Sequence, residues 1–328
     1  MFGASRRIPL LFVFVTILGG LAGCRSTSRE RVYRIGLGPW VGFGPLYLAD
    51  EKGFFQARGI HVDMTVLTGL AERNSALQTG AIDALAAPVD SFVLAAGNNI
   101  PSKIVMAIDE SNGGDGIVAK KGIVRFEDLK GKRVAFQRGL PSEFFLRALL
   151  EEHGMRLDDL RAVDMETAQA GAAFISNQLD AAGLWEPWLS KAVEEGNGHV
   201  LASTKEFPNL ILDCIAFRPS VIATNSADVQ KIIEALLEAI NYWKQHPEEA
   251  DRIMAPHFQV DPAKYAAILS GARFCDLARN REYFGTDASG TIFKIVERAS
   301  KIWIDAGVIK GQVVPESVVT PLIIRGAN

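Results

Sequence analysis

Short apolar segments alternate with amphipathic segments along most of this chain, and this alternation limits the possible folds most strongly. The first unit covers residues 35–55, with the sequence IGLGPWVGFGPLYLADEKGFF. Its apolar run ends in a glycine-rich turn, and Pro45 then begins a helix, since proline has a suitable fixed φ at the first helical position. Strands that alternate with helices are typical of a mostly parallel α/β sheet, where ligands bind beyond the carboxyl ends of the strands.

The turn at residues 38–44 allows two interpretations. The free N–H groups of Leu46 and Tyr47 at the start of the helix favour an anion. Alternatively, the glycines only allow the chain to bend. They do not form the dinucleotide-binding pattern G-x-G-x-x-G, because its third glycine would have to replace Val41.

The alternation continues through the chain and predicts a mixed α/β architecture. Strands are predicted at 60–67, 82–87, 104–108, 116–119, 133–136, 162–164, 181–184, 211–216 and 221–223. Helices are predicted at 70–79, 91–96, 167–177, 229–244 and 291–306, with another that ends at His153. A segment of helix, x-Asp-Ala, strand and loop occurs at 76–90 and again at 174–187. This repetition suggests two similar α/β lobes, although these common residues could also coincide by chance.

The first residues have the pattern of an export signal. Arg6 and Arg7 precede the apolar run 8–18, which is too short to span a bilayer and fits a signal peptide. The sequence Leu-Ala-Gly-Cys at 21–24 resembles a bacterial lipobox, so residues 1–23 are predicted to be the signal peptide and Cys24 the lipidation site. Residues 24–32 would form a tether. The alternative is an ordinary cleavage site with a chance cysteine. We therefore expect an extracytoplasmic protein, in the periplasm or at the cell surface, with a lipid anchor in a bacterial membrane.

Composition excludes several functions. The chain has 328 residues, with 35 basic and 38 acidic side chains and no basic block, so nucleic acid is not an expected partner. Roughly 300 residues after the signal suggest two domains. Besides Cys24, only Cys214 and Cys275 remain. Export permits a disulfide between them, and two buried thiols are the alternative.

No catalytic pattern is present. The five histidines are scattered, and there is no G-x-S-x-G elbow or phosphate-binding P-loop, so we expect neither an enzyme nor a metal or other cofactor. The predicted strands instead end in aromatic or polar loops, as a small-molecule pocket requires. The candidate residues in these loops are Trp40, Phe43, Thr68, Asp90, Glu110, Ser111, Arg138, Ser142, Trp185 and Glu186.

These candidates also have structural interpretations. Asp109, Glu110 and Asp115 could form a solvated acidic loop, and Trp185 could cap a core. Arg138 could be a surface residue, and Ser142 could cap a helix. We predict that Trp40→Ala weakens binding of the small molecule while leaving the melting of the empty protein nearly unchanged.

Six stretches in the chain resemble the solute-binding proteins of nitrate/sulfonate/taurine-type (NitT/TauT) ABC importers. They are PW at 39–40 with PLYLA at 45–49, EKGFF at 51–55, GAIDA at 80–84, GDGIVAK at 114–120, DLKGK at 128–132 and WEPW at 185–188. The resemblance implies a type II periplasmic-binding fold with two α/β lobes joined by a two-strand hinge. Lobe one would comprise residues 33–118 and 217–328, and lobe two residues 119–216. The hinge strands would lie near 117–118 and 215–217.

The resemblance also implies a mechanism and a set of cleft residues. The lobes of a monomer would close around a small solute, and the closed form would dock on a membrane permease with its ATPase. The cleft would be lined by loops that include Trp40, Gly42 and Phe43, then Thr68, Val89 and Asp90, Arg138 and Ser142, and Trp185 and Glu186.

The acids among the candidates bear on the solute, which we expect to be sulfonate- or taurine-like or related. Asp90, Glu110, Asp164 and Glu186 are too many acids for a bare anion, so they favour a zwitterion such as taurine or another amine. Two other functions remain. A sensory binding protein would present its loaded form to a receptor. An enzyme on the same fold, such as a pyrimidine-precursor synthase, fits less well because the chain lacks that enzyme's cysteine-rich motif and carries an export signal.

Overall fold

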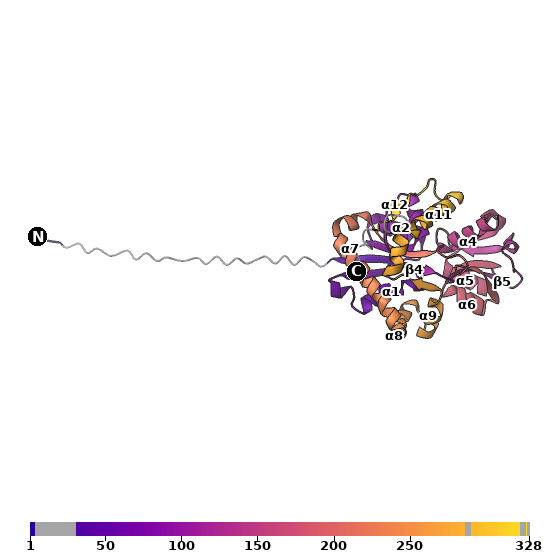
Figure 1. Cartoon of the computed structure of the whole chain (residues 1–328), viewed down its shortest axis with the longest axis horizontal. Helices are drawn as coiled ribbons and strands as arrows, with labels where there is room; N and C mark the ends of the chain where they lie inside the picture. The colour runs from indigo at the N-terminus through magenta and orange to yellow at the C-terminus, as the bar shows by residue number, and fades with distance from the viewer. Residues whose placement is uncertain (4–30, 286–289, 322–325, 327–328) are drawn as a thin grey trace. The chain divides into compact units, whose positions relative to one another are not determined.

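The computed structural model describes residues 1–3, 31–285, 290–321 and 326 (Figure 1). Most of the predicted signal peptide, with Cys24 and most of the tether, lies outside the described residues. The described residues from 31 onward form one compact unit. Within the described part of the chain, no helix combines the length and apolar character that crossing a membrane requires.

The first sheet has six strands in the order β11-β4-β10-β3-β1-β2. Their bounds are β1 Val32–Leu37, β2 His61–Val66, β3 Ala84–Pro88, β4 Lys103–Ser111, β10 Leu212–Phe217 and β11 Ala272–Phe274. Strand β1 pairs in parallel with β2 and β3, whereas β10 runs antiparallel between β3 and β4. Strands β3 and β10 are buried along their whole length, as their continuous apolar sequences predict.

The second sheet has five strands in the order β7-β6-β8-β5-β9. Their bounds are β5 Asp115–Lys120, β6 Arg133–Phe136, β7 Arg161–Asp164, β8 Ala181–Trp185 and β9 Gly198–Ser203. Its order matches β2-β1-β3-β10-β4 of the first sheet, so β3 and β8 hold equivalent positions, and β10 and β5 are the equivalent antiparallel strands. The two similar α/β lobes suggested by the sequence repeat are therefore confirmed.

Each predicted hinge strand belongs to a single sheet. Ile117 and Val118 lie in β5 of the second sheet, and residues 215–217 lie in β10 of the first. The chain passes between the sheets just before these strands, at 112–114 and at 204–211. We therefore propose that the first lobe comprises residues 31–111 and 212–321, and the second lobe residues 115–203. Both limits fall earlier in the chain than the sequence predicted.

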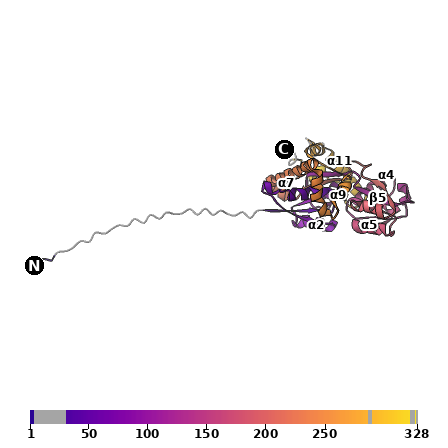
Figure 2. The same cartoon turned by 90° about the horizontal axis from the view of Figure 1, so that it is seen from below.

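Helices cover both sheets, and six of those in the described residues have proline in their first turn. Their bounds are α1 Gly44–Glu51, α2 Leu70–Thr79, α3 Val89–Gly97, α4 Pro141–Glu152, α5 Thr167–Ile175, α6 Trp188–Glu195, α7 Pro219–Gln245, α8 Pro247–Met254, α9 Pro262–Leu269, α10 Leu277–Phe284, α11 Thr291–Asp305 and α12 Pro315–Val318. Helices α4, α5 and α6 gather around the second sheet (Figure 1), and Figure 2 shows α4 and α5 beside β5 of that sheet. The strand predicted at 221–223 is wrong, because this segment lies in α7, which begins at Pro219.

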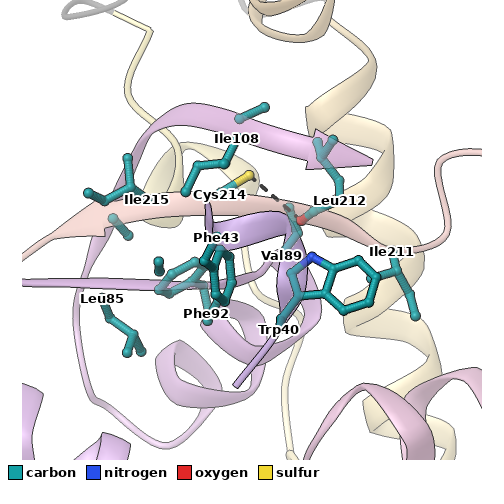
Figure 3. Close-up of a cluster of buried hydrophobic side chains, with 14 of the residues drawn as sticks. Trp40, Phe43, Leu85, Val89, Phe92, Ile108, Ile211, Leu212, Cys214 and Ile215 are labelled. Atoms are coloured by element: carbon teal, nitrogen blue, oxygen red, sulfur yellow. Dashed lines mark hydrogen bonds between the residues drawn. The ribbon is translucent and has the colours of Figure 1, made fainter. Parts of the chain in front are cut away.

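The core of the first lobe surrounds β10. Figure 3 shows Phe43, Phe92 and Cys214 within this core, and Trp40 at its edge beside Ile211. Cys214 and Cys275 are free and buried, which agrees with the alternative of two buried thiols rather than a disulfide. Burial raises the pKa of the Cys214 thiol, so this sulfur is held as an inert neutral group.

Candidate functional site

A small cavity of about 30 Å³ lies where the two lobes meet. Its walls follow the carboxyl ends of β1, β3 and β8, where an α/β sheet is expected to bind ligands. The lining residues are Gly38, Pro39, Trp40, Phe43, Arg73, Pro88, Asp115, Pro141, Trp185, Ile211 and Asp213. Two tryptophans and three prolines therefore form rigid walls, while one arginine and two aspartates supply charge.

Trp40 links the cavity wall to the core. Its side chain is only 6% exposed, and its indole Nε1 donates a hydrogen bond to Asp109 at 3.1 Å. Gly42 makes this contact possible, because a Cβ at that position would overlap both Trp40 Nε1 and the Asp109 carboxyl. The glycine of this turn thus has a packing role that the sequence did not reveal.

Arg73 is a cavity residue that the sequence analysis missed. It comes from α2 and is 5% exposed. Its Nε donates to the carbonyl of Leu67 at 2.9 Å, and its Nη2 lies only 2.6 Å from where a Cβ on Gly38 would stand. No acid among the described residues reaches ion-pair distance of this guanidinium. Burial lowers the pKa of Arg73 to about 10, and Asp213 and Asp90 partly offset this effect, so the group stays cationic at neutral pH.

Four buried aspartates surround the cavity or lie just behind it. They are Asp90 at the start of α3, Asp109 near the end of β4, Asp115 at the start of β5 and Asp213 in β10. Burial is the main cause that raises the pKa of Asp90 and Asp109 to about 8 and that of Asp115 to about 7. Burial and the neighbouring carboxyls also raise the pKa of Asp213.

Asp90 is the least satisfied of these acids. It is 2% exposed, and among the described residues neither carboxyl oxygen accepts a hydrogen bond of good geometry, although the nearby backbone N–H groups of Asp90 and Ser91 partly offset the rise in its pKa. Such a group is costly to bury, and in native proteins it commonly faces a ligand, an ion or water. The predicted solvated acidic loop is wrong, because Asp109, Glu110 and Asp115 are all buried.

The cavity brings together only some of the predicted site residues. Trp40, Phe43 and Trp185 line it, and Val89 and Gly42 lie buried directly beside lining residues. Thr68 instead contacts the other lobe, since its carbonyl accepts a hydrogen bond from Gln137 Nε2 at 3.0 Å.

The remaining predicted residues have structural partners outside the cavity lining. Arg138 and Asp164 form an exposed ion pair at 3.0 Å, which agrees with the surface interpretation of Arg138. Glu110 accepts from Arg279 at 2.7 Å, and Glu186 accepts from the Ser190 hydroxyl at 2.6 Å. Ser142 Oγ accepts from the backbone N–H of Gln137, so it fixes the turn before α4.

The sequence does contain a signal for two of the charged residues that were not predicted to line the site. Asp213 and Asp109 each stand within or at the end of an apolar strand, in LDCIAF and KIVMAIDES, where an acid is unusual. Arg73 had no such signal, because α2 has the sequence LAERNSALQT and resembles a solvated helix.

Comparisons with known proteins agree with this architecture. Residues 40–250 match the family model described as NMT1/THI5 like. A binding protein of Brucella abortus (strain 2308) is 31% identical over 220 residues, which are 66% of this chain and 68% of the relative. The taurine-binding periplasmic protein of Escherichia coli (strain K12) is 24% identical over 156 residues, 48% of each chain.

Solved structures show the same fold. The alkanesulfonate-binding protein SsuA from Xanthomonas axonopodis pv. citri, bound to MOPS, has a TM-score of 0.75 at 20% identity, covering 88% of this chain and 98% of that one. The nitrate-binding protein NrtA from Synechocystis PCC 6803 has a TM-score of 0.71 at 16% identity, covering 90% and 88%. The chain therefore belongs to the NMT1/THI5-like family and is a solute-binding protein of the NitT/TauT type.

Proposed function

We propose that this protein captures a small organic solute between its two lobes, outside the cytoplasm, and delivers it to an ABC permease with its ATPase. The observation that carries the proposal is the cavity where the lobes meet, which combines Trp40 and Trp185 with buried Arg73 and Asp115. Aromatic walls with a few fixed polar groups suit a small solute. The lobes would have to separate to admit it, because a volume of about 30 Å³ holds only about one water molecule. Relatives named for taurine and aliphatic sulfonates support a solute of this size.

Opening of the lobes would separate apolar as well as polar contacts, because Phe144 of α4 packs against Trp303 of α11 and both lobes contribute to one buried cluster. Residues 112–114 and 204–211 are the two covalent connections between the lobes. Polar contacts across the interface include Lys264–Glu194 at 3.5 Å and Arg298–Glu152 at 3.0 Å. Exposed pairs of this kind contribute about 0–1 kcal/mol each. A solute that contacts both lobes can therefore shift the population toward the closed form that a permease would recognise.

The carboxyls at the cavity suit a solute with an amine, because an ammonium group would stabilise their ionised form against the burial that raises their pKa values. Glu110, Asp164 and Glu186, on which this expectation first rested, have structural partners. Asp90, Asp115 and Asp213 replace them as acids at or beside the cavity. We therefore expect the thermal midpoint to rise with taurine or another amine-bearing solute in a screen that also contains alkanesulfonates, nitrate and pyrimidines. A rise with nitrate or plain alkanesulfonates alone would contradict the amine.

The lipid anchor is a separate part of the proposal and has its own test. Cys24 follows Leu-Ala-Gly in the predicted lipobox. Replacing Cys24 with serine should remove the thiol that would carry the lipid, so the protein should move from the membrane fraction to the soluble fraction on cell fractionation. Membrane association that persists in Cys24→Ser would refute lipidation and leave solute capture untouched. Cys275→Ser, a change at a buried thiol, serves as the matched control.

A further inference from the structure

Two buried carboxyls face the cavity from opposite lobes, each close to a connection between the lobes. Asp115 is the first residue of β5 in the second lobe and is 4% exposed. Asp213 is the second residue of β10 in the first lobe and is 3% exposed. Both line the cavity, and neither forms an ion pair within 4.0 Å in the described part of the chain. The protein therefore buries two acids between its lobes without a paired cation.

Hydrogen bonds join the two connections beside these acids. The Thr204 N–H donates to the carbonyl of Asp115 at 2.9 Å, and the Gly113 N–H donates to Thr204 Oγ1 at 2.8 Å. The hydroxyls of Thr204 and Ser111 are 2.8 Å apart. The chain segments that carry the acids can therefore stay together when the lobes separate. Opening would mainly let water reach the two carboxyls, since the closed arrangement of the structure leaves a volume of only about 30 Å³.

We infer that closing of the empty protein is coupled to proton uptake by Asp115 and Asp213, so that low pH favours the closed lobes and high pH the open lobes. This inference rests on the proposed movement of the lobes and adds a regulation by pH that does not depend on the identity of the solute. A carboxyl ionises readily in water, whereas burial without a paired cation favours its neutral form. Closing removes both carboxyls from water and should draw protons onto them, and opening should release these protons.

The pKa values of the two acids in the closed arrangement agree with this coupling. Burial is the largest cause that raises the pKa of Asp115 to about 7 and the pKa of Asp213 well above its usual value. Hydration in the open form should return both pKa values to about 4.

The sign of the pH dependence follows from these values. Below about pH 4 both forms are protonated, so the closed form is fully favoured there. Above this pH the closed form holds protons that the open form has lost, and the ratio of closed to open protein falls by up to about tenfold per pH unit for each carboxyl. The contribution of Asp115 is complete near pH 7, and that of Asp213 continues above it.

The surrounding groups keep this sign. The charged or titratable neighbours are Arg73, Asp90, Asp109, Glu110, Glu186 and Cys214. Once ionised, Asp115 repels Asp90 and Asp213 across the boundary between the lobes. Arg73 partly offsets the raised pKa values of these two acids, which belong to its own lobe, and it keeps its proton because its pKa is about 10. Repulsion between the lobes therefore adds to the effect of hydration and favours opening at high pH.

Distance measurements between the lobes test the coupling without a solute. Spin labels can be attached to the cysteines of Ser75→Cys in α2 and Gln169→Cys in α5, two exposed positions on different lobes. Cys24→Ser removes one native cysteine, and the other two are buried. We expect pulsed electron spin resonance to show a closed and an open distance, with a closed-to-open ratio that falls at least tenfold from pH 5 to pH 8. A ratio independent of pH, or a single distance at every pH, would overturn the inference.

Variants assign the protons to the two carboxyls, because asparagine resembles a neutral carboxyl and cannot ionise. Asp115→Asn should make the fall in the ratio between pH 5 and 7 at least tenfold smaller. Asp213→Asn should also reduce the fall, including the part above pH 7. Asp63→Asn, the same change at an exposed position of β2, is the control and should leave the pH profile unchanged. A full pH dependence in both site variants, or a ratio shifted equally at every pH, would overturn the assignment.

The solute screen separates this inference from the proposed function. A thermal shift with a solute of the screen, together with a lobe ratio that does not respond to pH, would overturn the proton coupling and leave solute capture intact. A ratio that follows pH while no solute of the screen binds would support the coupling and count against solute capture.

Discussion

Trp40→Ala is expected to lower the free energy of unfolding of the empty protein by about 3–5 kcal/mol, the usual cost of truncating a buried tryptophan. Trp40 is 6% exposed and packs at the edge of the first-lobe core. Its loss would also leave Asp109 without the indole donor. This expectation reverses the sequence prediction that the empty protein would be little affected. Chemical denaturation monitored by circular dichroism measures the change.

Trp40→Phe separates the two contributions of this side chain. Phenylalanine keeps an aromatic ring in the cavity wall but removes the Nε1 donor to Asp109. We expect a smaller loss of about 1–3 kcal/mol, which is the cost of a buried polar group left without its partner. A loss below about 0.5 kcal/mol for Trp40→Ala would mean that the indole is not packed as the structure shows.

Local signals predicted the order of the elements well. Gly80 ends α2 in the left-handed conformation at φ 75°, a position that the sequence already suggested as a helix end. Pro45 likewise lies in the first turn of α1, which begins one residue earlier at Gly44. Glycine and proline act through their own backbone geometry, so their effect can be predicted without knowledge of distant residues.

The wrong predictions concern segments whose structure depends on tertiary contacts. Residues 221–223 have the sequence Val-Ile-Ala, which favours a strand. In the structure, Pro219 starts a helical segment that continues to Gln245 across a kink at Asn225, and Val221 packs in the first-lobe core on one face of its first turns. The local preference for a strand is thus outweighed by burial along the helix.

For the same reason, the sequence could not show which charged residues lie at the site. Arg138 follows a predicted strand and is therefore a candidate site residue from sequence. Arg73 lies within a polar helix and gives no such signal. The fold then exposes Arg138 beside Asp164 and buries Arg73 at 5% exposure beneath the turn that contains Gly38. Which arginine is buried depends on how α2 packs against the turn after β1, and no local pattern encodes that contact.

The empty protein is expected to become less stable as the pH rises from about 5 to 8. Burial raises the pKa of Asp90 from 3.8 to about 8 in the folded state. Within this interval the folded protein holds a proton that the unfolded chain has released, so the free energy of unfolding falls with increasing pH. The stabilisation is fully present below pH 3.8 and is lost as the pH passes through 8. The slope approaches about 1.4 kcal/mol per pH unit for each such carboxyl.

The other titratable groups that face the cavity either also lower the stability as the pH rises or do not titrate between about pH 5 and 8. Asp109 and Asp213 also have raised pKa values, and Asp115 has a pKa raised to about 7. Arg73 keeps its proton throughout, because its lowered pKa is still about 10. Half-buried acids such as Asp128, Asp180 and Asp276 have lowered pKa values, so they change the stability only below about pH 5.

Asp90→Asn removes the contribution of one carboxyl to this pH dependence of the free energy of unfolding. The amide cannot ionise, so the slope of unfolding free energy against pH should become less negative by up to about 1.4 kcal/mol per unit between pH 5 and 7. Urea unfolding at four pH values measures this slope, and the exposed change Asp63→Asn should leave it as in the unmodified protein. An unchanged slope in Asp90→Asn would show that Asp90 is ionised in the folded state. A bound ammonium group would favour the ionised acids, so a saturating amine-bearing solute should reduce the same slope by releasing their protons.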